Sequence, residues 1–412
     1  MRICLVSQEY PPETARGGIG SQNWTKARAL ARLGHEVHVL SSATGAAEGL
    51  VTRTDDGVSV HRIEPPGVAF PVYEAPAYWL GYTWSVLRGL HELMGSREFD
   101  VIDFAEYGAE GFAYQLDRTP WSFAPVVVQL HGPLSMFADR IGWPEPGSEL
   151  ERVGTFMEEV SIQRADALMA CSANIADFTA PRHGVPRESI DVVHCGVDSD
   201  AFNPPPAGYR EGLPPTVLFV GNLAENKGLG TVLDAVLSLR SKWPELQLRV
   251  LGKGEGSFLA DLRERARSAG AEDALDLAGF VGDREELPGL YRSAHVFASP
   301  AQHEVGVANV YLEAMACGCP VLAAATGAAP EAITHDESGL LVAPGDVPAT
   351  AAALDRILGD PALAARMGEA GRRRVDDYFS IDRYVERVLG TYERAIAAPG
   401  AERRELEPEG VP

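Results

Sequence analysis

The sequence predicts an α/β protein with two doubly wound domains, each a parallel sheet covered by helices. Short apolar runs alternate with amphipathic stretches along the chain, which is the pattern of such sheets. The alternation starts again after a Pro-rich segment at 203–215. With 412 residues, the chain is also longer than one hydrophobic core normally organises. We therefore expect two Rossmann-like domains with a cleft between them.

The first half contains six short apolar runs that predict buried parallel strands, because they lack the alternation of a half-exposed strand. They cover residues 2–6, 35–40, 100–103, 126–129, 167–172 and 191–194. Residues 21–33 have apolar positions at helical spacing and stop at Gly34, a residue type that commonly ends helices. Residues 1–202 are expected to form the N-terminal domain.

The segment 203–215 (NPPPAGYREGLPP) can form neither a helix nor a central strand, so it is the expected hinge. A second Rossmann-like domain is expected over 216–379. Its strands are predicted at 216–220, 246–251, 274–278, 295–299 and 320–323. A final helix at 380–397 is expected to pack back toward the first domain. The tail 398–412 is charged and contains Pro and Gly, so disorder is expected there.

The composition excludes several classes of partner. The chain has 36 Lys and Arg against 58 Asp and Glu, a net charge of −22, which repels nucleic acid. The densest basic run, Arg372–Arg374, is interpreted as a solvated helix face, although such a patch would allow peripheral membrane contact. No apolar run reaches the roughly eighteen residues of a membrane span.

Features of the termini and cysteines favour a cytoplasmic protein. The apolar run at the N-terminus is too short for a signal peptide and predicts a buried strand instead. Five cysteines without a shared spacing fit a reducing compartment. Cys317 and Cys319 have no second Cys or His pair nearby, so we interpret them as small core residues rather than zinc ligands.

Three glycine-containing loops follow predicted strands, where the ligand crevice of a doubly wound sheet lies. The first, Arg16–Gly20, opens a helix, but it lacks the spacing of the dinucleotide fingerprint. The second, Gly221–Gly228, carries Lys227, and the third, Gly252–Glu255, carries Lys253. Any one of them can be a tight turn. Three such loops with two cations together favour binding of a phosphorylated ligand.

Two carboxylates flank the start of a predicted helix near Val307. The free N–H groups of that helix, around Gly306 to Asn309, attract an anion such as a diphosphate. A diphosphate would repel Glu304 and Glu313, but carboxylates bind hydroxyl groups well. A nucleotide sugar, with its diphosphate between two hydroxyl-bearing rings, satisfies both requirements. The alternative is that Glu304 favours the helix dipole and Glu313 is a solvated helical residue.

At this point the motifs resemble those of a known family. The second half resembles the nucleotide-sugar-binding domain of glycosyltransferase family 4, retaining transferases of the GT-B fold. Six motifs follow in the order of that family, at 220–228, 251–255, 278–282, 304–321, 326–331 and 338–346. In the first half, the glycine loop and the histidine of the run 127–132 also match. The likeness covers most of residues 1–395.

The resemblance implies roles for particular residues. Lys227 would hold the diphosphate, Glu304 would contact hydroxyls of the donor sugar, and Glu313 would hold the ribose. Residues near Gly279 and Phe280 would frame the base, and His131 would lie beside the reacting sugar carbon. The expected catalytic residues are His131, Glu304 and Lys227. The expected donor-binding residues are Gly18, Asn222, Lys227, Lys253, Gly279, Phe280, Glu304, Gly306, Val307, Ala308, Asn309 and Glu313. Arg16 and Gly17 are the expected acceptor-binding residues.

Two departures from the family pattern affect these roles. An arginine usually stands where this chain has Asn222, so a cation for the diphosphate is missing, for which Lys253 or Arg16 would compensate. Seven residues usually separate the two glutamates, whereas eight lie between Glu304 and Glu313. A one-residue bulge before the helix would return Glu304 to its place, so the ribose assignment of Glu313 is the more secure.

The function that follows is metal-independent transfer of a sugar from a nucleoside diphosphate to an acceptor. Neither a metal nor another cofactor is expected. Uridine is the expected base, with guanosine or adenosine next, and the acceptor is a glycan, a lipid-linked sugar or a small molecule. Three alternatives stay open: a nucleotide-sugar epimerase, a glycosidase with Glu304 and Glu313 as its acid and nucleophile, and a noncatalytic nucleotide-sugar-binding subunit.

Overall fold

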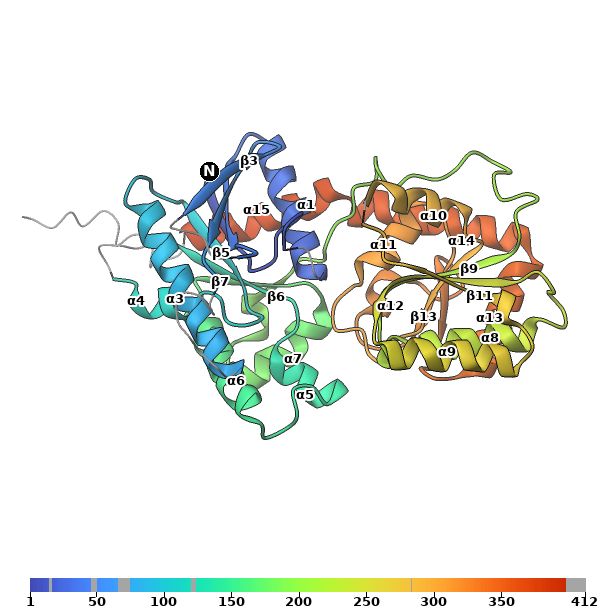
Figure 1. Cartoon of the computed structure of the whole chain (residues 1–412). Coiled ribbons are helices and arrows are strands. Elements are labelled where there is room, and N and C mark those ends of the chain that lie inside the picture. Colours follow the sequence, from blue (N-terminus) through green and yellow to red (C-terminus); the bar gives the residue numbers. More distant parts are fainter. Residues whose placement is uncertain (15–16, 46–49, 66–74, 120–123, 283, 398–412) are drawn as a thin grey trace, which may run out of the picture. The chain divides into compact units, whose positions relative to one another are not determined.

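A computed structural model describes residues 1–14, 17–45, 50–65, 75–119, 124–282 and 284–397 (Figure 1). The chain forms two compact units. The first comprises Met1–Cys195 with Ile381–Pro412, and the second comprises Gly196–Ser380. The expected disordered tail 398–412 lies outside the described residues.

The first unit is built on an eight-stranded sheet with the order β3-β4-β2-β1-β5-β6-β7-β8. All neighbouring strands are parallel except β3 and β4. The strands are β1 (Arg2–Val6), β2 (Glu36–Ser42), β3 (Val51–Asp55), β4 (Val58–Ile63), β5 (Val101–Ala105), β6 (Val126–Leu130), β7 (Ala167–Ala170) and β8 (Ile190–Val192). All six strands predicted in this half are confirmed to within a few residues.

The hairpin formed by β3 and β4 was not predicted from the sequence. Its turn is Asp56-Gly57, and both residues have positive φ, 47° and 84°. An Asp-Gly pair between β-rich runs is a typical hairpin sequence, so this signal was present in the chain. The helices of the first unit are α1 (Gly18–Arg32), α3 (Ala75–Met94), α4 (Phe112–Asp117), α5 (Leu134–Ile141), α6 (Glu149–Gln163), α7 (Ala173–His183) and α15 (Ile381–Ala397), with a 3-10 turn at Arg187–Ser189.

The predicted final helix, α15, belongs to the first unit, as expected. It lies beside α1 and the β5–β7 part of the sheet (Figure 1). The hydroxyl groups of its buried tyrosines form hydrogen bonds with the sheet. Tyr392 donates to Asp103 on β5 at 2.5 Å, and the Tyr384 hydroxyl lies 3.3 Å from Gln129 Nε2 on β6. These contacts, with the apolar residues around them, attach the end of the chain to the first sheet.

The second unit is built on a six-stranded parallel sheet with the order β11-β10-β9-β12-β13-β14. In chain order this is 3-2-1-4-5-6, the order of a Rossmann fold. The strands are β9 (Thr216–Leu223), β10 (Gln247–Gly254), β11 (Leu275–Gly279), β12 (Val296–Ser299), β13 (Val321–Ala324) and β14 (Gly339–Val342). The five predicted strands are confirmed, and β14 is an addition to them.

Helices of the second unit follow its strands in turn. They are α8 (Leu229–Leu239), α9 (Gly256–Ser268), α10 (Leu287–Ser293), α11 (Asn309–Ala316), α12 (Ala329–Ala332), α13 (Val347–Gly359) and α14 (Pro361–Arg374). Short 3-10 turns occur at Glu225–Lys227, Glu272–Ala274 and Arg284–Glu286, and a π-helical turn at Val375–Phe379. In a strand order of this kind, the chain adds successive strands to one side of β9 and then, from β12 on, to the other side. Ligands bind at the carboxyl ends of the strands at this reversal point.

The Pro-rich segment 203–215 forms no helix or strand, as expected, but it is part of the second unit. The units divide between Cys195 and Gly196, before the expected boundary. Arginine side chains account for the difference. Arg292 donates to the carbonyl of Asn203 at 2.8 Å, and Arg210 donates to the carbonyl of Arg292 at 3.0 Å. These bonds fasten the segment to the second unit.

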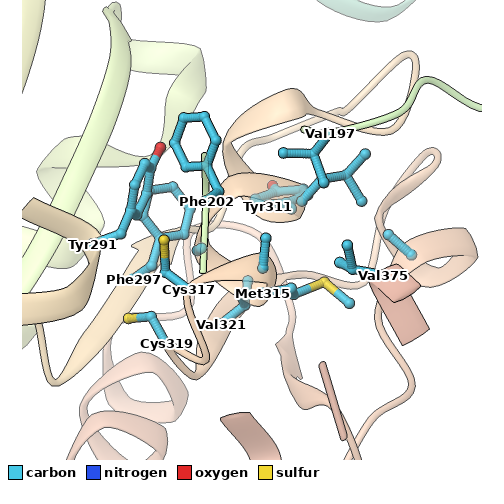
Figure 2. Close-up of a cluster of buried hydrophobic side chains, with 14 of the residues drawn as sticks. Val197, Phe202, Tyr291, Phe297, Tyr311, Met315, Cys317, Cys319, Val321 and Val375 are labelled. Atoms are coloured by element: carbon cyan, nitrogen blue, oxygen red, sulfur yellow. The ribbon is translucent and has the colours of Figure 1, made fainter. Parts of the chain in front are cut away.

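Cys317 and Cys319 lie in a core of the second unit, where Figure 2 shows their sulfur atoms among aromatic and aliphatic side chains. Both are buried, and burial raises the pKa of each thiol, to about 12 for Cys317 and about 11 for Cys319. Among the described residues, no group of three or more His, Cys, Asp or Glu side chains could hold a metal ion. The interpretation of the two cysteines as core residues is confirmed.

The run Arg372–Arg374 is not the solvated face that its sequence suggested. Arg372 donates to the carbonyls of Ser199, Phe202 and Ala316 at 2.9–3.1 Å. Arg374 donates to the carbonyls of Ala332 and Glu331 at 2.6 and 2.7 Å. Two of the three guanidinium groups therefore satisfy backbone carbonyls, which a sequence pattern does not reveal. In the described part of the chain, no helix is long and apolar enough to cross a membrane.

Candidate active site

Lys227 and Glu304 meet at the point where the second sheet reverses its order. Lys227 lies in the turn that follows β9, and Glu304 lies in the loop that follows β12. Lys227 Nζ lies 2.6 Å from Glu304 Oε1. The lysine side chain is 35% exposed and the glutamate side chain 9%, so one edge of this ion pair is open to a ligand. The structure brings together the two residues expected to bind the diphosphate and the sugar.

Close contacts between backbones hold the loops around this ion pair. A Cβ on Gly228, which has φ +79°, would lie 2.3 Å from the carbonyl oxygen of Pro300. A Cβ on Gly327 would lie 1.8 Å from the carbonyl oxygen of Glu304. Ala328 N–H donates to that same oxygen at 2.8 Å. Only glycine permits these close approaches, and they hold the Glu304 loop packed between the loops that follow β9 and β13.

Glu313 lies on α11 and is 4% exposed, so it is not a solvated helical residue. Its Oε1 accepts a hydrogen bond from Arg284 Nη2 at 2.7 Å, and its Oε2 accepts one from the Tyr291 hydroxyl at 2.9 Å. Burial, followed by the charge of Glu313, raises the pKa of Tyr291 well above its usual value. The tyrosine hydroxyl therefore stays protonated and donates. Arg284 and Tyr291 were not expected from the sequence, because neither lies in a motif that indicates contact with Glu313.

Lys253 stands beside Asn222, the position at which the expected arginine is missing. The two residues are direct partners in the parallel pairing of β9 and β10. Lys253 Nζ lies 4.1 Å from the centre of the Phe280 ring, a cation–π contact. Phe280 is 58% exposed and follows Gly279, which has φ +83°. A cation and an exposed aromatic ring thus lie at the carboxyl ends of β10 and β11, on one side of β9.

The helix expected near Val307 begins at Asn309, after the N-cap residue Ala308. Val307 is 3% exposed and packs in the same core as Tyr311, so it anchors the helix start rather than facing solvent. Gly306 lies in the loop between Glu304 and this anchor. The first turn of α11 therefore follows the Glu304 loop directly, at the end of the sheet where Lys227 lies.

In the first unit, His131 follows β6, as expected from the sequence. Glu106, which follows β5, accepts the backbone N–H of His131 at 2.6 Å and also that of Gly132. Burial raises the pKa of Glu106 to about 7, and the backbone donors oppose that rise. Gly17 is the extended N-cap of α1, and Gly18 is its first residue. Arg16, the other expected acceptor-binding residue, lies outside the described residues.

Two further buried carboxylates hold loops of the first unit. Glu110 accepts the N–H of Gln8 at 2.8 Å, and Glu158 accepts the N–H of Leu134 at 2.8 Å. Burial is the main cause that raises the pKa of Glu110, to about 8, and it raises the pKa of Glu158 well above its usual value. These glutamates were not expected from the sequence, because nothing in their local pattern distinguishes them from surface acids.

Comparison with known proteins identifies the class to which this fold and site belong. The family described as Glycosyltransferase Family 4 matches residues 16–201, and the family described as Glycosyl transferases group 1 matches residues 209–374. The D-inositol 3-phosphate glycosyltransferase of Salinispora arenicola is 32% identical over 98% of this chain and 94% of that protein. The chain belongs to the group 1 glycosyltransferases of family 4 and is a glycosyltransferase.

Solved structures show the same fold. The sucrose-phosphate synthase of Thermosynechococcus elongatus has a TM-score of 0.78 at 22% identity, covering 96% of this chain and 99% of that chain. Anabaena Alr3699/HepE, solved in complex with UDP-glucose, has a TM-score of 0.73 at 19% identity, covering 95% of this chain and 99% of that chain. The expected GT-B fold is confirmed. Because the family consists of glycosyltransferases, the glycosidase and the noncatalytic alternatives are set aside.

Proposed function

We propose that this enzyme transfers a sugar from a nucleoside diphosphate sugar, with UDP-sugars favoured, to a hydroxyl of an acceptor and retains the anomeric configuration. The observation that carries the proposal is the Lys227–Glu304 pair at the reversal point of the second sheet. A lysine suits a diphosphate, and a carboxylate suits sugar hydroxyls. The donor would replace the contact between the two side chains with contacts of its own.

The nucleoside end of the donor would bind beside the diphosphate. Glu313 would accept hydrogen bonds from the ribose, since each of its oxygens has a second lone pair beyond the bonds from Arg284 and Tyr291. Phe280 offers an exposed ring to the base, and Lys253 stands at the position where it would compensate for Asn222. That Anabaena Alr3699/HepE was solved with UDP and with UDP-glucose supports a uridine donor.

Catalysis would consist of stabilising the diphosphate as it leaves the sugar. The charge that develops on its oxygens would be met by Lys227, by the first N–H groups of α11 and by loop backbone amides. These groups are fixed before the reaction, so little reorganisation is needed. We assign this neutralisation to protein groups rather than to a divalent metal. The first unit would supply His131 beside the reacting carbon and would bind the acceptor. Arg16 and Gly17 are the candidate acceptor-binding residues.

The acceptor belongs to one of three classes: a glycan, a lipid-linked sugar or a small molecule. The relatives at 31–32% identity that bear the name D-inositol 3-phosphate glycosyltransferase make a small polyol phosphate the first acceptor to test. Epimerisation of the donor is the competing function of the same fold, and it would need no acceptor at all.

A thermal-shift panel tests the proposal. UDP, GDP, ADP and their common sugar conjugates are added separately, and the midpoint of unfolding is measured. We expect UDP and a UDP-sugar to stabilise the protein, by about 2.7 kcal/mol at a hundredfold excess over Kd. The stabilising donor is then incubated with and without D-inositol 3-phosphate, and the products are separated. No shift with any nucleotide would refute the donor assignment, and product formation without an acceptor would favour the epimerase.

A further inference from the structure

The side chain of His131 has a hydrogen-bond partner to which the proposed mechanism gives no role. Cys171 Sγ lies 3.3 Å from His131 Nδ1. β6 and β7 are neighbouring parallel strands, and His131 and Cys171 each directly follow one of them. The pairing register therefore places the two side chains together. Both residues belong to the first unit.

A buried network decides which way this hydrogen bond runs. Lys26, 1% exposed, donates from Nζ to Gln129 Oε1 at 2.7 Å and to Asp103 at 2.6 Å. A lysine can only donate, so the oxygen of the Gln129 amide faces Lys26 and the nitrogen faces the other way. Gln129 Nε2 lies 3.4 Å from Cys171 Sγ. The sulfur thus accepts from Gln129, and its own hydrogen is left to donate.

Three acceptors compete for the hydrogen of the Cys171 thiol. Gln22 Oε1 is more distant, at 3.8 Å, and Cys195 offers only a sulfur, a weak acceptor. The unprotonated nitrogen of an imidazole is a stronger acceptor and lies closer. Contact with Cys195 and burial raise the pKa of the Cys171 thiol well above its usual value, although His131 opposes that rise. The sulfur therefore keeps its hydrogen and donates it to His131 Nδ1.

This bond fixes the tautomer of the imidazole. When Nδ1 accepts, the proton of the neutral ring must lie on Nε2. His131 Nε2 is buried and has no hydrogen-bond partner among the residues that the structure describes. A buried N–H without an acceptor destabilises the folded protein, so an oxygen of a bound ligand would be a favourable partner for it.

We propose that Cys171 is a positioning residue that holds His131 with its proton on Nε2, so that this N–H donates to an oxygen of the bound donor. The inference rests on the proposed function, because it assumes that the donor reaches His131. It makes His131 a hydrogen-bond donor in the complex rather than a general base. Gln129 and Lys26 support this arrangement from behind the thiol.

Nitrogen NMR of the protein labelled with ¹⁵N-histidine tests the tautomer without any substrate. The His131 signals are assigned by comparison with His131→Gln. We expect the proton on Nε2 in the wild type and in Cys171→Ser, which keeps a donor, and a mixture of tautomers in Cys171→Ala. Cys195→Ala is the matched control, since it removes the other thiol beside Cys171, and it should leave the signals unchanged. A wild-type proton on Nδ1, or a Cys171→Ala spectrum identical to the wild type, would overturn the proposal.

Steady-state kinetics with the donor found in the thermal-shift panel provide the second measurement. We expect Cys171→Ala to lower kcat about tenfold while the donor KM changes by less than about twofold. Cys171→Ser should recover most of kcat, and Cys195→Ala should match the wild type. A loss confined to KM, or an equal loss in Cys195→Ala, would indicate a structural role only. If the wild type transfers no sugar at all, the proposed function fails, but the NMR experiment still decides the tautomer.

Discussion

The two units place buried acids at the ends of their sheets but compensate them in different ways. In the second unit, Glu304 and Glu313 each face a cation, Lys227 or Arg284. In the first unit, Glu106 faces backbone N–H groups instead. A full positive charge balances a carboxylate more completely than amide dipoles do.

This difference separates two tasks. The charged side chains of the second unit can exchange their contacts with each other for contacts with a charged ligand. Binding of a nucleoside diphosphate would require such an exchange. In the first unit, Glu106 and Glu110 hold the backbone of loops, and burial raises their pKa values to about 7 and about 8. We infer that donor binding in the second unit depends on charge pairing, whereas loop order in the first unit depends on pH.

The largest effect is expected for Lys227→Ala. The variant loses the cation for the diphosphate and leaves Glu304 buried near an anionic ligand, so attraction is replaced by repulsion. We expect the affinity for the nucleoside diphosphate to fall about a hundredfold, or about 2.8 kcal/mol, as measured by calorimetry. The double variant Lys227→Ala/Glu304→Gln should regain thermal stability, because the unpaired charge is gone, but not regain affinity.

Lys242→Ala is the matched control for this experiment. Lys242 also forms an ion pair in the second unit, with Asp355 at 2.7 Å, and it lies beyond the carboxyl end of α8. The control should bind the nucleotide like the wild type. An unchanged affinity in Lys227→Ala would remove that lysine from the donor site and would end the contrast between the units.

The fold was largely predictable from the sequence, for a physical reason. Buried parallel strands are continuous apolar runs, and all eleven that were expected exist in the structure. The hairpin β3–β4 was missed because its strands carry charged and polar residues, although its Asp56-Gly57 turn is a typical signal. The unit boundary was misplaced because arginines such as Arg292 fasten the Pro-rich segment to one unit. Long-range side-chain bonds of that kind leave no local pattern.

The site was predictable where it lies in loops with special backbone needs. Gly228 directly follows Lys227, and Gly327, from a later motif, packs against the Glu304 carbonyl, so glycines that permit close approach mark these motifs in the chain. Arg284 and Cys171 act through side chains from separate segments, and their roles depend on what they contact after folding. Single residues on different strands or turns carry no spacing that a sequence analysis can detect.

The next effect in size concerns the pH dependence of stability. The pKa of Glu106 is about 7 in the folded protein, against a usual value of 4.5. Since the folded state binds this proton more tightly, its stabilising contribution is full below pH ~4.5 and is lost as the pH rises toward ~7. Glu106→Gln keeps an oxygen acceptor for the amides of His131 and Gly132 but cannot ionise. We expect the free energy of unfolding of the wild type to fall relative to this variant across that window, by on the order of 2 kcal/mol.

Urea unfolding at a series of pH values measures this difference. Glu106→Ala is the comparison variant, because it removes the acceptor as well as the charge. It should be less stable than Glu106→Gln at every pH, since two buried N–H groups lose their partner. A constant difference between the wild type and Glu106→Gln across the window would show that amide donors compensate this acid as fully as a cation does.

The smallest effect is expected for Arg284→Ala, which tests whether the cation beside Glu313 matters to the free protein. The Arg284 side chain is 40% exposed, and ion pairs of this exposure contribute less than about 1 kcal/mol to stability. Glu313 keeps the bond from the buried Tyr291 hydroxyl at 2.9 Å. Tyr291→Phe should therefore cost more, about 1–1.5 kcal/mol in urea unfolding, because it breaks a buried hydrogen bond. If Arg284→Ala proves the more costly, the cation and not the hydroxyl holds Glu313, and charge pairing organises the second unit before any donor binds.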